Sequence, residues 1–426
     1  MRKGLLLGAG FSMELGMPSA KEFSRALYNF LTPNKLRIAI DSMKRGEPYG
    51  KANPTCRDEY ENIYNLIVEY RDRQKENFNY ELLIGEISNL PYTSPKANLT
   101  RDHVGGYIDL LIGEMFRIFQ KNTYPIFNRN KEYYKSLFDI FCDDETWIFS
   151  LNHDIIIEML CVDLEIKLYM GNSKTLELPF DNALIGRSKT MLFGDMDNSE
   201  SNLDLLYFAR GEKGVNLIKL HGGMNEFTYN DEKQRLFFLP NNIENSESYM
   251  EELYLLTYAP HYYYLGNPVR LATEIAVSDN DGIMQFLQPS ILSGTEKFSP
   301  ATYGGKGVSK MEQFSKGIES MDELYIIGYG FGDEHINSRI SRAMHRNDEM
   351  RICVIDPYYS CPPILKPFDY SGRITSIYAN TIQSIRYLMT KKWYTQDEVK
   401  LFDLTWEHRS EIYEHMYNNI FRRDSK

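Results

Sequence analysis

Three side chains in this sequence could act on a substrate, and each comes just after a short apolar run. Asn152 and Asp154 come after residues 147–151, and His221 comes directly after residues 215–220. An imidazole can serve as a general base, and a neutral amide can hold a hydroxyl group or a water molecule beside a reacting carbon. A carboxylate can orient these neighbours or stabilise a positive charge that develops during a reaction. We therefore take Asn152, Asp154 and His221 as the catalytic candidates.

A glycine turn near the N-terminus could bind an anion. The apolar run 4–7 leads into Gly8-Ala9-Gly10-Phe11-Ser12, and Ser19 and Glu22 then form a capping-box pair for a helix. Glycine lacks a Cβ, so the backbone can approach a ligand closely, and free N–H groups at such a turn can point at phosphate oxygens. The dinucleotide-binding fingerprint is incomplete, because Met13 stands where its third glycine would be. A purely structural turn is the alternative. The ligand-binding candidates are Gly8, Ala9, Gly10 and Ser12.

A second glycine turn and two acidic residues follow later apolar runs. Residues 324–327 lead into Gly328-Tyr329-Gly330-Phe331-Gly332-Asp333, and residues 350–355 lead into Asp356. In dinucleotide-binding folds an acidic residue accepts hydrogen bonds from ribose hydroxyls. Asp333 also has the position of a helix N-cap. The further ligand-binding candidates are Gly328, Gly330, Asp333 and Asp356.

Each candidate has a structural alternative that the sequence leaves open. Asn152 and Asp154 could only cap the helix expected at 155–164, and Ser12 could cap a helix as well. His221 could be a buried, hydrogen-bonded histidine. Two further histidines border the motifs. We interpret His153 as a structural residue. We interpret His335 as a packed helix residue and keep it as a candidate site residue.

The apolar runs alternate with helical patterns along the chain. This alternation predicts an α/β fold with a Rossmann-like parallel sheet flanked by helices, together with a large, mostly helical insertion or second lobe. Ligands bind outside the carboxyl ends of the strands in such sheets, so the candidates should converge on one crevice. The expected strands are residues 4–7, 147–151, 215–220, 324–327, 350–355 and 374–378.

The long segments between these strands define the domain organisation. We predict one domain over residues 1–380 and a helical tail over 381–426, with a helical insertion at 20–143 and a second insertion at 224–315. The expected irregular segments are 33–56 and 170–214, and the expected helices are 58–73, 80–87, 103–119, 131–142, 155–164, 334–345, 380–390 and 397–421.

The composition excludes several classes of protein. The 426 residues carry a formal net charge of −11 and no long run of Lys or Arg, which disfavours direct nucleic-acid binding. No apolar run reaches the roughly 18 residues of a membrane span. The apolar N-terminal run is too short for a signal peptide, and Glu14 follows it closely. Unpaired cysteines are most simply explained as reduced core thiols, so we expect a cytoplasmic protein. The cysteines form no Cys-x-x-Cys pair, so neither a zinc site nor a disulfide framework is expected; they are Cys56, Cys142, Cys161, Cys353 and Cys361.

Five of these motifs, in their order along the chain, resemble those of the sirtuin family. Sirtuin-like domains carry a Gly-Ala-Gly-x-Ser loop, a strand ending in an Asn-x-Asp turn, a strand ending in His-Gly, a later glycine turn and a polar residue after the next strand. This sequence has them at residues 8–12, 152–154, 221–222, 328–333 and 356. The wording Gly-Tyr-Gly-Phe-Gly-Asp-Glu-His-Ile-Asn at 328–337 most resembles the sirtuin-like NAD hydrolases of bacterial anti-phage defence.

The sequence also departs from the pattern of the sirtuin deacylases. Pro18 is followed by Ser19-Ala20-Lys21 where those enzymes have Asp-Phe-Arg, and Gly330 stands where they place Ser. No cysteine pair exists for their four-cysteine zinc module. These departures argue against binding of an acyl-lysine peptide and leave NAD binding intact.

The resemblance implies an NAD⁺ glycohydrolase that cleaves the nicotinamide–ribose bond and depletes NAD⁺ in anti-phage defence by abortive infection, with no zinc. Asn152 would position the ribose or a water, and His221 would act as general base toward a ribose hydroxyl or that water. Asp154 would orient its neighbours or stabilise positive charge. Backbone donors around Gly10 to Ser12 would hold the diphosphate, and Asp356 would bind the adenosine ribose.

The resemblance also implies partners, because such an activity needs control in trans. The expected partners are other copies of this chain, in a homo-oligomer, and a HerA-type hexameric ATPase. Two alternatives remain open from the sequence: an NAD-dependent protein deacylase and a non-catalytic subunit that binds NAD or ADP-ribose. An endonuclease is disfavoured, because we find no clustered carboxylates with metal-binding spacing.

Overall fold

The structure is a computed structural model of the chain. It describes residues 2–44, 57–90, 95–141, 145–172, 174–182, 187–197, 207–208, 211–229, 234–240, 243–258, 261–264, 267–270, 275–278, 284–291 and 308–421. Two of the five cysteines, Cys56 and Cys142, lie outside these residues, and the other three are free thiols.

A parallel seven-stranded sheet forms the centre of the molecule. Its strands lie in the order β15-β14-β13-β1-β2-β6-β3, and every neighbouring pair is parallel. Apart from the edge strand β3, this is the 3-2-1-4-5-6 order of doubly wound folds, which confirms the predicted fold class. The strands are β1 (Lys3–Leu7), β2 (Glu145–Ser150), β3 (Leu168–Tyr169), β6 (Gly214–Lys219), β13 (Glu323–Ile327), β14 (Arg351–Ile355) and β15 (Ile374–Ile377).

The six strands expected from the sequence all form, because their apolar runs are buried. Strands β2 and β6 are buried along their whole length, and β1 is buried from its second residue. Parallel strands covered on both faces read as continuous apolar runs in a sequence, and this made them recognisable. The helices around the sheet are α7 (Ile156–Asp163), α9 (Val308–Glu319), α10 (Glu334–Arg346), η6 (Pro363–Leu365), α11 (Lys366–Tyr370), α12 (Thr381–Thr390), α13 (Gln396–His415) and the π-turn η7 (Met416–Ile420).

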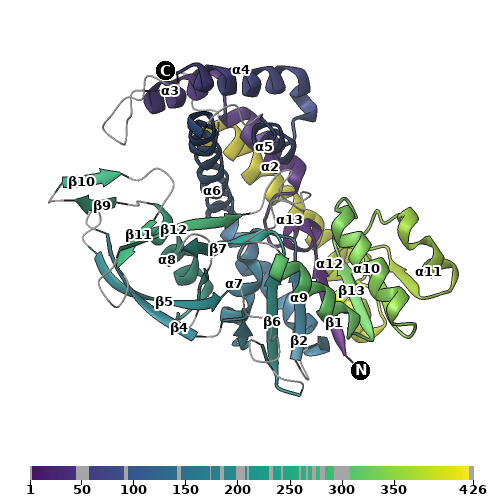
Figure 1. Cartoon of the computed structure of the whole chain (residues 1–426). Coiled ribbons are helices and arrows are strands. Elements are labelled where there is room, and N and C mark those ends of the chain that lie inside the picture. The colour runs from purple at the N-terminus through teal and green to yellow at the C-terminus, as the bar shows by residue number, and fades with distance from the viewer. Residues whose placement is uncertain are drawn as a thin grey trace.

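Between β1 and β2 the described residues form helices only. They are α1 (Ala9–Met13), α2 (Ala20–Phe30), α3 (Pro33–Lys44), α4 (Arg57–Gln74), η2 (Lys75–Asn77), α5 (Tyr80–Ser88) and α6 (Pro95–Phe141). The expected capping box is present, since Ser19 Oγ accepts from the Glu22 N–H and Glu22 accepts from the Ser19 N–H. In Figure 1 these helices stand above the end of the sheet toward which β1 runs. The domain boundaries remain a prediction.

Two predictions for this helical region are wrong. Residues 33–44 form α3 and not an irregular segment, because a proline is tolerated at the first position of a helix. The helices expected at 103–119 and 131–142 are one helix, α6, with Pro125 in its interior. An interior proline costs about 3 kcal/mol, and buried side chains on both sides of it, such as Phe119 and Phe127, offset that cost by packing.

A second, antiparallel sheet lies beside the first. Its strands are β4 (Lys174–Asn182), β5 (Arg187–Asp197), β7 (Gly222–Tyr229), β8 (Gln234–Phe238), β11 (Ile275–Ser278) and β12 (Met284–Ile291), with the pair β9 (His261–Tyr264) and β10 (Asn267–Arg270) and the helix α8 (Ser246–Tyr258) nearby. The prediction that residues 170–214 are irregular is wrong, since β4 and β5 form there. Their Asn, Asp, Lys and Gly residues have low strand propensity, and pairing across the ladder outweighs it.

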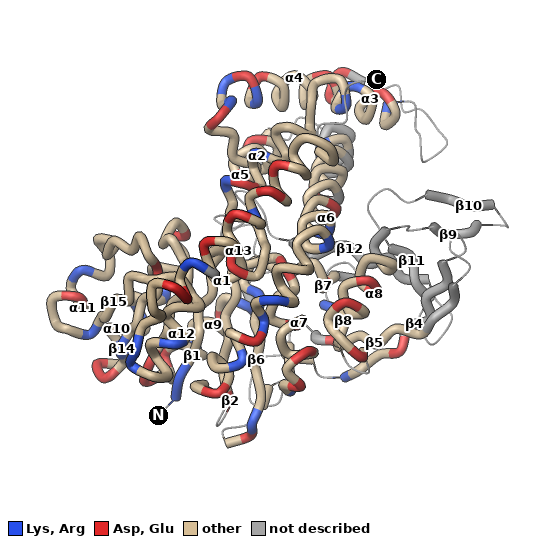
Figure 2. The backbone as a smooth tube through the Cα atoms, turned by 180° about the vertical axis from the view of Figure 1, so that it is seen from behind, with Lys and Arg blue, Asp and Glu red and all other residues tan. Residues whose placement is uncertain are grey.

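The backbone carries acidic and basic residues interleaved along its helices (Figure 2). None of the described helices is both long and apolar enough to span a bilayer.

The turns after β1 and β13 touch through their backbones. The Gly8 N–H donates to Ile327 O and the Gly10 N–H to Gly328 O, both at 3.0 Å. Gly328 has a φ of +63°, and a Cβ added to it would lie 2.5 Å from the Gly10 Cα. At Gly330, in the same turn, a Cβ would meet nothing within 4 Å. Glycine is therefore required at 328 and not at 330.

We predict that Gly328→Ala lowers the free energy of unfolding by about 3 kcal/mol or more, because it combines positive φ with a backbone clash. Gly330→Ala should stay within about 0.5 kcal/mol of the parent protein. Urea denaturation of both variants measures this. Equal losses in the two variants would contradict the described contact.

Candidate functional site

The candidate residues lie at one edge of the parallel sheet. Five adjacent strands, β14, β13, β1, β2 and β6, are followed by Asp356, Gly328, Gly8, Asn152 and His221 respectively. Parallel strands present their carboxyl ends on the same side, so these residues share one edge. We call it the carboxyl edge.

The glycine turn after β1 uses its own donors internally. The N–H groups of Gly8 and Gly10 bind carbonyls of the β13 turn, and the Phe11 N–H donates to Gly8 O at 3.1 Å. The expectation that the Gly10 and Phe11 donors are free for phosphate oxygens is therefore not met in this structure. Ala9 is exposed and is the member of the turn that faces solvent.

Asn152 joins β2 to the glycine turn. Its Nδ2 donates to Gly8 O at 2.9 Å and to Ser12 Oγ at 3.0 Å. Both amide protons are used, so the side-chain oxygen Oδ1 is the part left for a ligand. Asn152 does not cap α7, whose N-cap is Ile155, and Ser12 lies inside α1 rather than at a cap. The capping alternative is thus wrong for these two residues.

Asp154 is buried close to Ser12. The Ile156 N–H donates to Asp154 Oδ1 at 3.1 Å. Burial raises the pKa of Asp154, and the Lys219 ammonium opposes that shift. Lys219 itself donates to the Asp154 carbonyl and lies 2.9 Å from the Glu158 carboxylate. The sequence reasoning missed Lys219, although a lysine at the end of a buried strand was a usable signal.

His221 lies in the turn between the two sheets. Its side chain is 4% exposed, and its Nε2 is 3.7 Å from Asp333 Oδ2. Its ring centroid is 6.4 Å from that of His153, which is also buried and contacts Gly222 O through Nδ1 at 3.3 Å. The Met224 N–H also donates to His153 O, so the start of β7 is hydrogen-bonded to the turn after β2. The histidine is therefore close to the amide turn that carries Asn152.

Asp333 is the N-cap of α10, as expected, and yet its side chain makes no capping hydrogen bond. Its carboxylate faces His221 instead. The Asp333 backbone N–H donates to the Tyr329 hydroxyl at 3.1 Å. The Tyr329 hydroxyl in turn donates to Asn337 Oδ1, also at 3.1 Å. Neither Tyr329 nor Asn337 was singled out from the sequence, and both fix the turn that carries Asp333.

The other candidates lie farther out along the edge. Gly330 is exposed, and Asp356 is half-buried with Oδ1 accepting from the Tyr358 N–H at 2.7 Å. His335 is half-buried on α10, where its carbonyl accepts from Arg339 at 3.1 Å. The carboxyl edge thus has a tight centre at Asn152, Ser12 and Asp154, with His221 and Asp333 beside it.

Aromatic side chains of the helical region approach this edge. Phe116 of α6 packs edge-on against His153 with ring centroids 6.0 Å apart. Phe23 of α2 stacks on Phe116 at 4.2 Å and contacts Tyr80 of α5 at 4.9 Å. Burial raises the pKa of Tyr80, with smaller contributions from the charges of Glu81 and Asp333. The helical region therefore contributes apolar walls next to the histidine pair.

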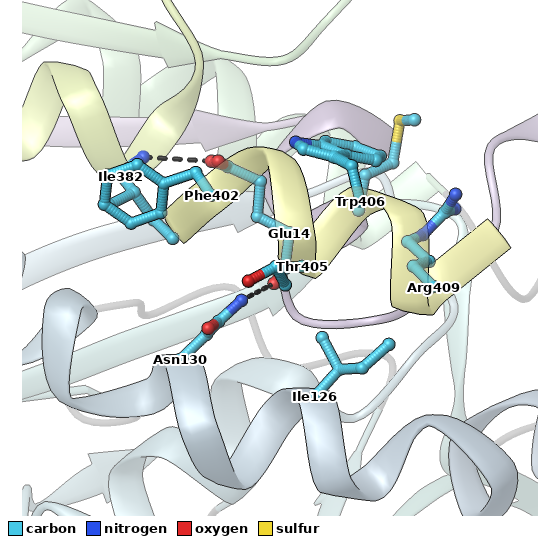
Figure 3. Close-up of a pocket in the computed structure, with 9 residues that line it drawn as sticks. Glu14, Ile126, Asn130, Ile382, Phe402, Thr405, Trp406 and Arg409 are labelled. Carbon is cyan, nitrogen blue, oxygen red and sulfur yellow. Dashed lines mark hydrogen bonds between the residues drawn. The ribbon is translucent and has the colours of Figure 1, made fainter. Parts of the chain in front are cut away.

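Glu14, directly after α1, connects the glycine turn to the C-terminal helices. Its Oε2 accepts from the Ile382 N–H at 2.9 Å at the start of α12, and its carbonyl accepts from Asn130 Nδ2 of α6 at 2.6 Å. Figure 3 shows the cavity of about 10 Å³ that it lines together with Arg409 of α13. Burial raises the pKa of Glu14 to about 7.

Helix α13 holds the segment that follows Glu14. Arg409 donates to both Glu22 oxygens, at 2.7 and 2.8 Å, and to Met17 O at 2.8 Å. The Tyr413 hydroxyl donates to Gly16 O at 2.7 Å. The loop behind the glycine turn is therefore fixed by residues close to 400 positions away in the sequence.

The described residues contain no group of three or more His, Cys, Asp or Glu side chains placed to hold a metal ion. Two cavities lined by described residues lie at Glu14 and on the half of the sheet formed by β13, β14 and β15.

Comparison with known proteins found likenesses among solved structures. The chain aligns with Sir2Tm bound to a propionylated peptide at 10% identity over 92% of each chain, with a TM-score of 0.31. A mutant Sir2 homologue in complex with 2′-O-acetyl-ADP-ribose aligns at 10% identity over 100% of this chain and 95% of that one, with a TM-score of 0.35. A mutant Sir2 homologue in complex with ADP-ribose aligns at 12% identity over 92% and 95%, with a TM-score of 0.33.

No family model matches the chain, and no curated protein matches it. Likenesses this distant carry no argument about the site, whose description rests on the contacts above.

We predict that Glu14→Gln removes a pH dependence of stability. The folded-state pKa of about 7 exceeds the ordinary value of 4.5. The contribution of Glu14 is therefore fully present below pH 4.5 and is lost as the pH rises through about 7. It amounts to about 3 kcal/mol. Gln keeps the acceptor for the Ile382 N–H and cannot ionise.

The measurement is the free energy of unfolding at several pH values from about 5 to about 8. The slope should flatten in Glu14→Gln and persist in Glu349→Gln, whose side chain is exposed. An unchanged slope in Glu14→Gln would show that this carboxyl does not titrate there.

Proposed function

We propose that this chain is an NAD⁺ glycohydrolase that acts at the carboxyl edge. The observation that carries the proposal is the Asn152 amide, oriented by its hydrogen bonds to Gly8 and Ser12, with the buried Asp154 and His221 beside it. It supplies an oriented amide, an imidazole and a carboxylate at the place where doubly wound sheets bind dinucleotides. The reaction is the one that the sequence motifs imply.

The proposed reaction breaks the bond between C1′ of the ribose and N1 of nicotinamide. Nicotinamide leaves with the bonding electron pair as a neutral molecule, and the ribose passes through an oxocarbenium-like state. A water molecule adds its oxygen to C1′ and gives up a proton, so the products are ADP-ribose, nicotinamide and one proton.

The residues have distinct parts in this scheme. Asn152 Oδ1 accepts a hydrogen bond from the water or a ribose hydroxyl, because Nδ2 is committed to Gly8 and Ser12. His221 takes the proton as general base. Asp333 orients the imidazole and stabilises its protonated form. Ser12 orients the Asn152 amide, and Asp154 stabilises the positive charge that develops on the ribose.

The dinucleotide would lie along the same edge. Gly8, Ala9 and Gly10 let the diphosphate approach the backbone, with Ala9 facing it from solvent. Gly328 shapes the turn after β13, Gly330 in the same turn leaves room for the ligand, and Asp356 accepts from the adenosine ribose hydroxyls.

We further propose that the activity serves anti-phage defence by abortive infection in the cytoplasm. The residues at 328–337, which resemble the sirtuin-like NAD hydrolases of anti-phage defence, support this role. Control would come from homo-oligomer assembly and from a HerA-type hexameric ATPase. Co-purification with the product of a neighbouring gene tests the partner, and full activity of an isolated monomer would remove the need for one.

Purified protein should release nicotinamide from NAD⁺, and Asn152→Ala and His221→Ala should each lower the rate by about 10²–10⁴-fold, because each removes a group that acts on the water or ribose. His408→Ala is the matched control, with a side chain 52% exposed on α13. Thermal unfolding checks that the variants fold. Unchanged turnover in both site variants would reject the assignment, and release that requires an acetylated peptide would indicate a deacylase.

We predict that Asp333→Asn lowers kcat at least about 10-fold with little change in KM, because it removes the partner of His221 rather than a ligand contact. The acid limb of the pH–rate profile should move to lower pH, since the lost carboxylate no longer favours the protonated imidazole. Asp348→Asn is the control, with a side chain 92% exposed. A raised KM with unchanged kcat would assign Asp333 to cofactor binding instead.

A further inference from the structure

A second cavity, of about 620 Å³, lies on the half of the sheet formed by β13, β14 and β15. It is lined by Glu323 and Arg351, the first residues of β13 and β14, and so begins at the end of the strands opposite the carboxyl edge. None of the candidate catalytic or NAD-binding residues lines it. Its volume is in the range of small-molecule sites.

The cavity exists because one face of these strands is incompletely covered. Arg351 and Thr375 are exposed and Cys353 is half-buried, whereas Ile352 and Val354, on the opposite face, are buried. Parallel sheets are normally covered on both faces. The cavity lining mixes charged and polar side chains, such as Glu323, Arg351 and Thr375, with aromatic and aliphatic ones. Such a lining suits a ligand that has both a flat apolar part and a charged part.

An aromatic wall closes one side of the cavity. Tyr387 of α12 and Trp393, just beyond it, stack with ring centroids 4.4 Å apart and an angle of 14° between the rings. Trp393 is 48% exposed, although its ring is already stacked on one side. Trp393 lines the cavity with an exposed aromatic ring, and a nucleobase can stack on such a ring.

Two cations line the same cavity. Arg351 and Lys391 form no ion pair among the described residues, and Lys391 lies 5.6 Å from the Tyr387 ring centroid. Lys391 ends α12 with a φ of +57°. The chain as a whole carries a net charge of −11, so two cations at one cavity that form no ion pair among the described residues are a local exception. Guanidinium and ammonium groups are the usual partners of phosphate.

The remaining charged residues of the cavity have other contacts. Arg373 is structural, because it donates to the carbonyls of Met350, Met344 and Asn347. Glu323 accepts from the Tyr325 hydroxyl at 3.0 Å and is the register partner of Arg351. Its second oxygen can accept from ribose hydroxyls, as acidic residues do in dinucleotide folds.

We propose that this cavity binds a nucleoside phosphate, with the base on Trp393, the phosphate on Arg351 and Lys391, and the ribose on Glu323. It is a site separate from the carboxyl edge, and it does not depend on the proposed NAD⁺ hydrolysis. Occupancy would tie α12 to the outer strands of the sheet.

The test is calorimetric titration of the full-length chain with AMP, with adenosine and with inorganic phosphate. AMP should bind, and Trp393→Ala should weaken binding roughly 5- to 150-fold, the range for one lost base stack. Arg351→Gln combined with Lys391→Gln should weaken AMP and phosphate but leave adenosine unchanged. Tyr370→Ala, an exposed aromatic outside the cavity, and Lys400→Gln are the matched controls and should bind AMP like the parent.

Repeating the AMP titration in His221→Ala separates the two sites, because that variant alters only the carboxyl edge. AMP binding that survives Trp393→Ala but is lost in His221→Ala would overturn the proposal, as would no binding up to roughly 1 mM AMP. A cavity variant that retains its thermal unfolding transition and loses AMP would support it, whether or not the protein hydrolyses NAD⁺.

Discussion

The geometry of the carboxyl edge depends on the backbone contact between the turns after β1 and β13. Gly8, Gly10 and Gly328 approach so closely that none has room for a Cβ. The contact fixes where α1 begins, and α1 in turn places Ser12 against Asn152. It also consumes the donors of Gly8 and Gly10, so the glycines here serve first to join two strand ends. The close approach therefore brings the β1 and β13 halves of the sheet to one site.

Buried charge pairs fix the other side of this edge. Lys219, at the end of β6, is paired with Glu158 of α7, and Glu226 of β7 contacts Lys310 of α9. All four side chains are almost fully buried, and burial lowers the pKa of Lys310 to about 8 despite the Glu226 charge. Such pairs add little net stability, yet loss of one partner costs about 3–5 kcal/mol. These two ion pairs fix β6 and β7, the strands before and after His221. The two-residue turn between the sheets is therefore anchored at both ends, and the position of His221 is fixed.

The sequence predicted the strands and the places where chemistry should occur, because both follow from local patterns. The apolar runs at β1, β2 and β6 could hardly be anything but buried strands, and polar residues after them had to share an edge once the strands were parallel. The antiparallel strands β4 and β5 were missed because their pattern is polar. Helix α6 was divided in two because Pro125 is a local stop signal that long-range packing overrides.

The contacts that define the site could not be predicted from the sequence, since they join residues far apart in it. The Glu14 carboxylate accepts a hydrogen bond from the Ile382 N–H at the start of α12, which is 368 residues away in the sequence. Asp333 looked like an ordinary N-cap, and only the tertiary structure shows that its carboxylate faces His221 instead of its own helix. Lys219, at the end of a buried strand, signalled a buried charge, but nothing near it in the sequence shows that its partner is Glu158. Sequence patterns over a few residues therefore indicate where the site lies, whereas contacts between residues far apart in the sequence determine its geometry.

The most direct test is a crystal structure of the full chain with ADP-ribose bound. We expect the ligand to lie along the carboxyl edge, with its diphosphate over Ala9 and its terminal ribose within hydrogen-bonding distance of Asn152 Oδ1 and His221. Density for ADP-ribose elsewhere, with Asn152 and His221 contacting only protein, would contradict it.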